Sequence, residues 1–160
     1  MTDEHTPDET LRRTVWRMEI TDVLHAYAYH FDRGEVDLLG ALFTDDAVVD
    51  YGPEMTVIEG REALVDVIAQ GQIDVFEATS HHVSNVTVTV TSDTAASAVA
   101  YVYAWHRYRD GSPDGYLWGQ YHTELRRSDR GWLISRLTLR AAGLVDFHRE
   151  VMHPIRPASG

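Results

Sequence analysis

The chain has 160 residues and a formal net charge of −11, and it contains neither cysteine nor lysine. The absence of cysteine excludes disulfides, thiol catalysis and thiolate metal ligands, and the absence of lysine excludes Schiff-base chemistry. The acidic charge without a visible basic stretch argues against a nucleic-acid partner, and no apolar run reaches the ~18 residues of a membrane span.

The N-terminal part has the pattern of one long helix. Thr6-Pro7-Asp8-Glu9 is typical of a helix start, with Thr as the cap, Pro at the first position and Glu three residues after Thr. Apolar residues recur at mostly helical spacing from Val15 to Phe31, and Gly34 is a suitable terminator. Because the whole span is long for a globular helix, we expect residues 1–10 to form a flexible arm.

Three shorter elements are predicted next. Residues 37–43 favour a short helix, residues 47–51 are β-branched and favour a strand, and residues 60–70 show helical periodicity.

Beyond Thr79 the composition changes to β-branched and aromatic residues. Short Gly-, Ser- and Asp-containing breaks separate four runs, which cover residues 83–91, 94–108, 116–127 and 131–142. This arrangement indicates antiparallel hairpins. The Pro-rich residues 147–160 are expected to be an irregular tail. The chain is therefore predicted to be a single α+β domain over residues 1–160, in which a curved antiparallel sheet wraps around about three N-terminal helices and encloses a pocket.

Alternation along residues 94–108 defines two faces of a strand. One carries Ala100, Val102, Ala104 and His106; the other carries Tyr101, Tyr103 and Trp105. The small side chains leave space, so we favour their face as the pocket wall, with His106 inside. The aromatic face suggests self-association. Periodicity alone leaves open which face is which.

Asp32 stands out at the end of the first helix. The C-terminus of a helix carries partial negative charge, so an acid there is mildly unfavourable. Local rules are most often broken at functional sites. An Asp beside a His makes a general base, because it fixes the tautomer and stabilises the imidazolium.

His81 opens the predicted strand that follows, and His82 is its neighbour. Regular alternation with Val86, Val88 and Val90 would place His82 on the core face. A bulge near Ser84 would reverse this and turn His81 inward. Choosing His81 therefore requires an irregular strand.

The chain resembles the SnoaL-like branch of the nuclear-transport-factor-2-like superfamily from about Met18 to Arg140. Within it, the resemblance is to the group of scytalone dehydratase, bile-acid 7α-dehydratase and hexachlorocyclohexane dehydrochlorinase. The motifs that carry the resemblance are Tyr27-x4-Asp32, Leu42-Phe43-Thr44-Asp45-Asp46-Ala47-Val48, Gly60-Arg61-Glu62-Ala63-Leu64, His81-x3-Asn85 and Gly131-Trp132-Leu133-Ile134-Ser135-Arg136.

The resemblance implies a cone-shaped apolar pocket, chemistry without a cofactor or metal, and a catalytic Asp–His pair with a nearby Tyr. By matching position, Asp32 and His81 would form the pair and Tyr27 would be the Tyr. Tyr27 lies about 140° around an ideal helix from Asp32, so a core role for Tyr27 is an equal alternative.

Four further residues are predicted to bind substrate, each with a structural alternative. Arg136 matches an Arg on the last strand of some members, although Leu137 could hold the equivalent position. His106 and His122 could instead be structural histidines on adjacent strands. Asn85 is favoured to hold a strand edge in place. A metal site formed by His81, His106 and His122 is conceivable, but no carboxylate completes a recognisable spacing.

We expect a cytoplasmic dehydratase-type lyase or isomerase that acts on a hydrophobic oxygenated carbocycle, such as a polyketide, steroid-like or aromatic metabolite. The acidic N-terminus has no signal-peptide pattern. A homo-oligomer, trimer or dimer, is expected, with no membrane or nucleic-acid partner. A polyketide aldol cyclase that uses Asp32 as an acid is one alternative. A non-catalytic ligand-binding or assembly subunit is another, because fold does not settle function.

Overall fold

A single long helix, α1 (Pro7–Arg33), dominates the N-terminal part of the computed structural model, which describes residues 6–156. The Thr6 side chain accepts a hydrogen bond from the Glu9 backbone N–H at 3.3 Å, as expected of a helix cap. At the other end, Gly34 has a φ of 66°, a left-handed conformation that glycine adopts without steric cost. Both predicted helix boundaries are therefore confirmed.

The expected arm over residues 1–10 is wrong for residues 7–10, which already belong to α1. Residues 1–5 lie outside the described residues. The helix remains stable over this length because it buries a stripe of apolar side chains, namely Trp16, Ile20, Leu24, Tyr27 and Ala28.

Two further helices and two short strands follow α1. They are α2 (Val36–Gly40), β1 (Phe43–Asp50), β2 (Ile58–Glu59) and α3 (Arg61–Asp74). The predicted short helix ends earlier than expected, and β1 begins at Phe43, because Phe43 pairs with Ile134 in the sheet. Such long-range pairing leaves no mark on local periodicity.

Four long strands form an antiparallel meander: β3 (Phe76–Val90), β4 (Ala95–Tyr108), β5 (Gly115–Ser128) and β6 (Gly131–Val145). The sheet order is β2-β1-β6-β5-β4-β3, and β7 (His153–Pro154) pairs with β6 at Arg140 and Ala141, beyond the part of β6 that pairs with β1. Both β1 and β7 run parallel to β6, so the sheet is mixed and not purely antiparallel as predicted. Turn signals reveal hairpins, but they do not reveal pairing between distant strands.

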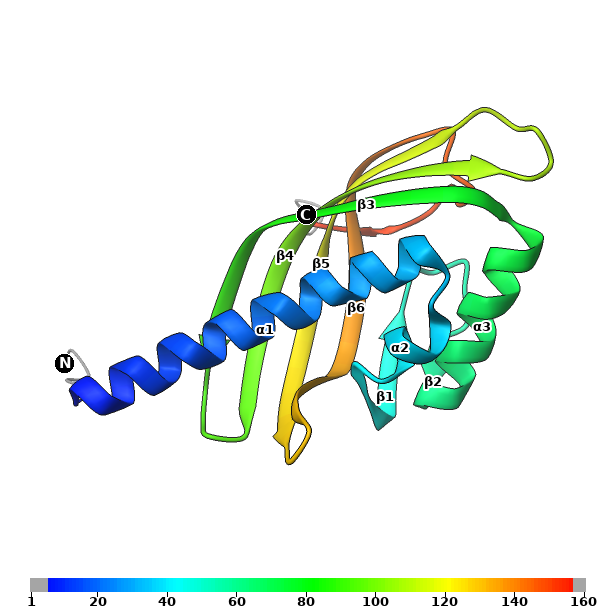
Figure 1. Ribbon diagram of the computed structural model, residues 1–160. Coiled ribbons are helices and arrows are strands. Elements are labelled where there is room, and N and C mark those ends of the chain that lie inside the picture. Colours follow the sequence, from blue (N-terminus) through cyan, green and yellow to red (C-terminus); the bar gives the residue numbers. More distant parts are fainter. Residues whose placement is uncertain (1–5, 157–160) are drawn as a thin grey trace.

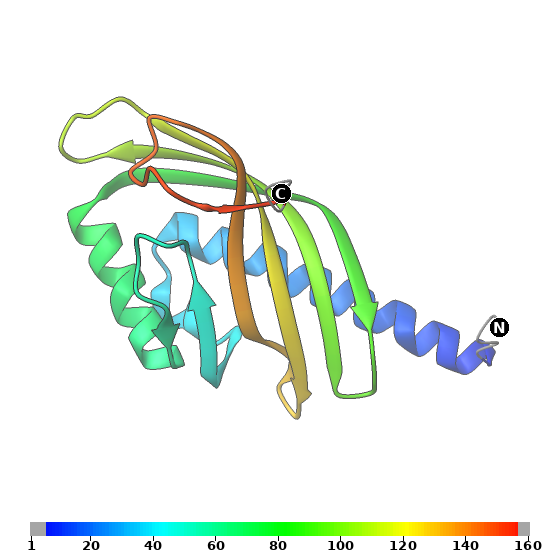
Figure 2. The same cartoon turned by 180° about the vertical axis from the view of Figure 1, so that it is seen from behind.

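The sheet curves over the helices, with α1 lying across its concave side (Figures 1 and 2). Burial along β4 alternates as expected: Ala100, Val102 and Ala104 are in the core, while Tyr101 on the other face is 48% exposed. The predicted α+β class is thus confirmed, and the small-residue face of β4 is the buried one, although, of the four residues predicted on that face, only Ala104 and His106 line a cavity.

A β-bulge interrupts β3 between Ser84 and Thr87. Ser84 pairs with Tyr101 and Thr87 with Val99, so two residues of β3 lie opposite Ala100 alone. Asn85 sits in the bulge with a φ of 48°. The extra residue reverses the alternation. Upstream of the bulge, His81 therefore faces the helices, and His82 is exposed.

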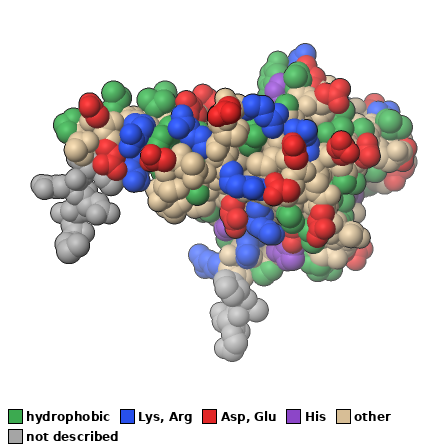
Figure 3. All heavy atoms as spheres, turned by 90° about the horizontal axis from the view of Figure 1, so that it is seen from below, with side chains coloured by type: hydrophobic (Ala, Val, Ile, Leu, Met, Phe, Trp, Pro, Cys, Tyr) green, Lys and Arg blue, Asp and Glu red, His purple; other side chains and the backbone are tan. Residues whose placement is uncertain are grey.

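Among residues 6–156, no helix is long and apolar enough to cross a membrane. On the face shown in Figure 3, arginine side chains are interspersed with acidic ones and form no continuous basic surface.

The bulge yields a stability prediction. Asn85→Val should lower the free energy of unfolding by about 1–3 kcal/mol, because a β-branched residue is strained at positive φ. Asn85→Gly should not show this loss. Thr87→Val, an exposed site in the regular part of β3, is the matched control and should change stability by less than about 0.5 kcal/mol. Urea unfolding measures all three, and equal stability of the two valine variants would contradict the role of the bulge.

Candidate active site

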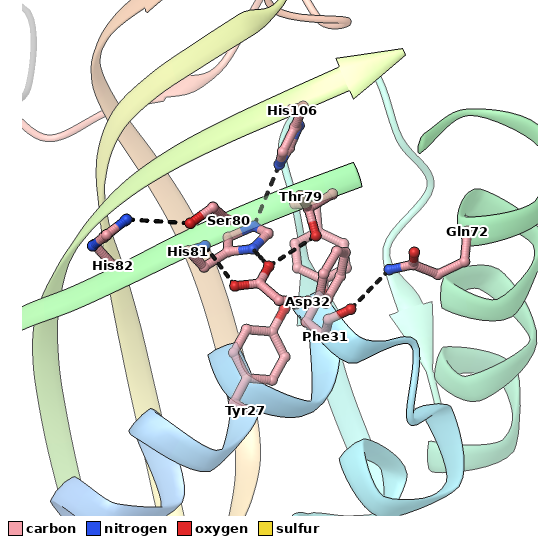
Figure 4. Close-up of polar contacts among 10 residues, drawn as sticks. Tyr27, Phe31, Asp32, Gln72, Thr79, Ser80, His81, His82 and His106 are labelled. Carbon is pink, nitrogen blue, oxygen red and sulfur yellow. Dashed lines mark hydrogen bonds and ion pairs between the residues drawn. The ribbon is translucent and has the colours of Figure 1, made fainter. Parts of the chain in front are cut away.

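Asp32 lies in the last turn of α1, where that helix meets β3. Its carboxylate accepts three hydrogen bonds from β3: from the His81 backbone N–H at 2.8 Å, from His81 Nδ1 at 2.6 Å and from the Thr79 hydroxyl at 2.8 Å (Figure 4). These donors compensate for the unfavourable position of an acid at a helix C-terminus. The structure therefore brings the predicted pair into direct contact.

The ionisation of Asp32 follows from this environment. Burial opposes the charged form, but the hydrogen bonds from His81 and Thr79 outweigh it and lower the pKa of the carboxyl below its ordinary value. An ionised carboxylate only accepts hydrogen bonds, so His81 Nδ1 carries the proton of this bond. Neutral His81 then has its lone pair on Nε2.

Nε2 of His81 lies 3.3 Å from Nε2 of His106, on the neighbouring strand β4. Because His81 Nε2 is the acceptor, His106 Nε2 is the donor. The other ring nitrogen of His106, Nδ1, is buried without a hydrogen-bond partner in the described part of the chain. Burial, reinforced by unfavourable electrostatic interactions of a protonated ring with neighbouring His81, His148 and Arg149, lowers the pKa of His106 to about 2. His106 is therefore neutral and holds one proton, which points toward His81.

Both histidines line a cavity of about 350 Å³ between the helices and the concave side of the sheet. The His81 side chain is only 6% exposed, and the Phe31 ring packs against the imidazole with 4.8 Å between the ring centroids. Aromatic and aliphatic side chains supply most of the wall, among them Phe31, Met55, Ile68, Phe76, Leu117 and Leu139. Asp32 itself is not part of the wall and lies behind His81. The volume suits a small organic ligand.

Tyr27 lines the same cavity and donates to, or accepts from, Tyr51 with a hydroxyl–hydroxyl distance of 2.7 Å. Burial raises the pKa of Tyr27 well above its ordinary value and that of Tyr51 to about 12. Both hydroxyls are therefore protonated. The helix stays regular to Arg33, so Tyr27 and Asp32 point in different directions from α1. Both can still belong to one site, because the cavity and the residues behind its wall span a wide arc of this helix.

The structure places three predicted substrate-binding residues away from the cavity. The Arg136 side chain is half exposed and lies 3.9 Å from Glu124, whereas neighbouring Leu137 is buried, so the core register falls on Leu137. His122 lies on the outer face of β5 and contacts Gln120 at 3.0 Å. Asn85 forms the bulge, the structural role favoured for it.

His122 is also separated from His81 and His106 by the sheet, so these three cannot form the conceivable metal site. His82 lies outside the cavity as well, and its ring faces Ser80 at 3.2 Å (Figure 4).

Sequence reasoning missed two sets of cavity residues. Tyr51 could have been found, because Ala47, Val49 and Tyr51 alternate on one face of the strand. The segment Phe147–Arg149 carried no signal, because it belongs to the predicted irregular tail, yet all three of its residues line the cavity.

Comparisons with known proteins agree with this architecture. The family model described as a SnoaL-like domain matches residues 12–138. A Novosphingobium aromaticivorans DSM 12444 protein, provisionally assigned as a scytalone dehydratase, is 34% identical over 94% of this chain and 99% of its own, with a TM-score of 0.87. The chain belongs to the SnoaL-like domain family, as its motifs predicted.

Two other solved structures are similar. One, from Novosphingobium aromaticivorans and provisionally assigned as an aromatic ring hydroxylase, is 29% identical over 81% of this chain and 91% of its own, with a TM-score of 0.76. Hexachlorocyclohexane dehydrochlorinase LinA type 3 from Novosphingobium barchaimii LL02 shares the fold at 18% identity over 92% of this chain and 99% of its own, with a TM-score of 0.76. A search of curated proteins finds no match.

The lowered pKa of Asp32 yields a pH prediction. A carboxyl whose pKa is lower in the folded state stabilises the fold fully above its unfolded pKa of about 3.9, and this contribution is lost as the pH falls toward the folded value. Wild type should therefore be more stable than Asp32→Asn near pH 7, and the difference should shrink below about pH 4. Urea unfolding of both proteins across this range tests the prediction, and a difference that is constant with pH would contradict it.

Proposed function

We propose that the protein is a cofactor-independent lyase of the dehydratase type, or an isomerase, that acts on a hydrophobic oxygenated carbocycle. The observation that carries the proposal is the Asp32-bound His81, whose Nε2 faces a largely apolar cavity. A base held in this way, away from bulk water, suits the removal of a proton from carbon.

In the proposed reaction, His81 Nε2 takes a proton from a carbon next to a carbonyl group. Asp32 holds the ring through Nδ1–H and stabilises the imidazolium that forms. In an elimination, the bond to a β-hydroxyl then breaks, the departing oxygen takes a proton from the imidazolium, and water leaves. In an isomerisation, the same proton returns to another carbon.

The negative charge that develops on the carbonyl oxygen needs hydrogen-bond donors. One of the Tyr27 and Tyr51 hydroxyls donates its proton to the other, so the second hydroxyl can donate its own proton to a ligand. Both residues line the cavity. Neutral His106 offers its Nε2–H once a substrate displaces it from His81. Donors placed in a dry site stabilise such charge strongly.

The two alternatives fit the geometry less well. A cyclase that uses Asp32 as an acid needs a protonated carboxyl that reaches the substrate, but the Asp32 pKa is lowered and the side chain lies behind His81. A binding or assembly module gives no reason for Asp32 and His81 to be in contact.

The proposal predicts different roles for two adjacent histidines. His81→Ala should reduce turnover by about 10²–10⁴-fold, because it removes the general base. His82→Ala, the matched control on the other face of β3, should retain activity close to wild type. Because a relative is provisionally assigned as a scytalone dehydratase, the assay uses a panel of cyclic β-hydroxyketones that includes scytalone.

Deuterium exchange in heavy water gives a second readout. Proton NMR follows hydrogen at the carbon next to the carbonyl, so it reports proton abstraction even where no group leaves. Equal exchange rates in wild type and His81→Ala would contradict the proposal. A larger loss in Asp32→Asn than in His81→Ala would favour the cyclase.

A further inference from the structure

The C-terminal strap, which we define as residues 146–156, folds back from the end of β6 (Figure 2). Its residues Phe147–Arg149 line one side of the cavity. The strap contacts β1 and the loop that follows β1, and it also contacts β4 and β6. The Glu54 carboxylate accepts hydrogen bonds from the backbone N–H groups of Glu150, at 3.1 Å, and Val151, at 2.9 Å. His153 Nε2 lies 2.9 Å from the Asp50 carboxylate.

This strap carries Arg149 into the cavity wall. One guanidinium nitrogen, Nη1, donates to the Tyr51 carbonyl at 2.8 Å, and the guanidinium carbon lies 5.7 Å from the centre of the Tyr51 ring. Burial is extensive enough to lower the pKa of Arg149, against the opposing effect of nearby tyrosines and Glu54.

The charge of Arg149 has no direct counter-charge. Among residues 6–156, no carboxylate oxygen lies within 4.0 Å of its guanidinium nitrogens. The nearby carboxylate of Glu54 is engaged by the backbone of the strap. The hydroxyls of Tyr27, Tyr51 and Tyr108 are neutral, because burial raises the pKa of each.

A guanidinium in the wall of a cavity without a counter-charge lowers the stability of the protein unless a partner accepts its hydrogen bonds. Arg149 is partly buried, and a charge that is partly taken out of water lowers stability when no counter-charge pairs with it. Arg presents five donors in a rigid fork that matches two oxygens of one planar anion. Within residues 6–156, only one of the Arg149 nitrogens donates to the protein. The missing partner is therefore expected on the ligand.

We propose that Arg149 binds a planar oxyanion of the substrate, either a carboxylate or the enolate of an ionised β-dicarbonyl. The proposed substrate class is thereby narrowed to oxygenated carbocycles that carry an acidic group. The inference rests on the proposed function, because it takes the ligand of this cavity to be the substrate. Arg149 then determines specificity, and His81 supplies the base.

Binding of unreactive probes tests this inference without turnover. Naphthoate and neutral naphthylmethanol differ in the charge of one substituent, and isothermal titration calorimetry gives the affinity of each. Wild type should bind naphthoate more tightly than naphthylmethanol. Arg149→Gln should weaken naphthoate binding by about tenfold or more, and it should change naphthylmethanol binding by less than about twofold.

Arg140→Gln is the matched control. Arg140 Nη1 also donates to a backbone carbonyl of the strap, that of Pro154 at 3.2 Å, but Arg140 does not line the cavity. This variant should keep the preference for naphthoate. If Arg149→Gln does not fold, the wild-type comparison still decides: no preference for either anionic probe, naphthoate or dimedone, over naphthylmethanol would overturn the inference, as would an equal effect of both Arg variants.

Two further binding measurements distinguish a carboxylate from an enolate ligand and separate anion binding from catalysis. Dimedone, a cyclic β-diketone that is ionised at neutral pH, represents the enolate. Arg149-dependent binding of either naphthoate or dimedone supports the inference and names the source, and binding of neither overturns it. His81→Ala should keep the Arg149-dependent preference, so the anion site and the catalytic base can fail separately.

Discussion

The site depends on one contact, the hydrogen-bonded pair of Asp32 and His81, which joins the end of α1 to β3 across 49 residues of chain. The pair orients the imidazole, keeps the carboxylate ionised and holds the helix end against the sheet. It requires a helix that stops at Gly34 and a strand whose alternation is reversed by the bulge at Asn85. Without the bulge, the inward position would fall to His82.

The cavity that His81 faces is assembled from segments far apart in the sequence. Helices α1 and α3 supply apolar walls, the sheet supplies Ala104, larger apolar side chains and the two histidines His81 and His106, and the C-terminal strap closes one side. The polar groups inside follow a common physical pattern. Burial keeps His106 and the tyrosines neutral, so they act as fixed hydrogen-bond donors, while Asp32 lies behind His81 and Arg149 lies on the strap. A site of this kind can stabilise developing negative charge without reorganising solvent.

Much of the layout was predictable because it follows from local periodicity and turn chemistry. The ends of α1 and the two faces of β4 were predicted for this reason, and the small side chains on one face favoured it as the inward one. The proximity of Asp32 and His81 was predicted mainly from resemblance, and their catalytic roles remain predictions. Arg136 was placed one residue out of register, because the match of a short motif does not fix the phase of a strand whose pairing shifts near Glu124. His122 lies on the outer face of β5, and alternation alone does not decide which face of that strand is the inner one.

By itself, the sequence determined the main helices and strands, their order, the two alternating faces of β4 and the family. Those features depend on residues near one another in the chain, whose spacing encodes which face is buried. Only the tertiary structure decided that β1 and β7 run parallel to β6, that the bulge turns His81 inward, and that Arg149 enters the cavity. Each of these depends on pairing between distant segments, where the gain comes from burial and hydrogen bonds that no local pattern records.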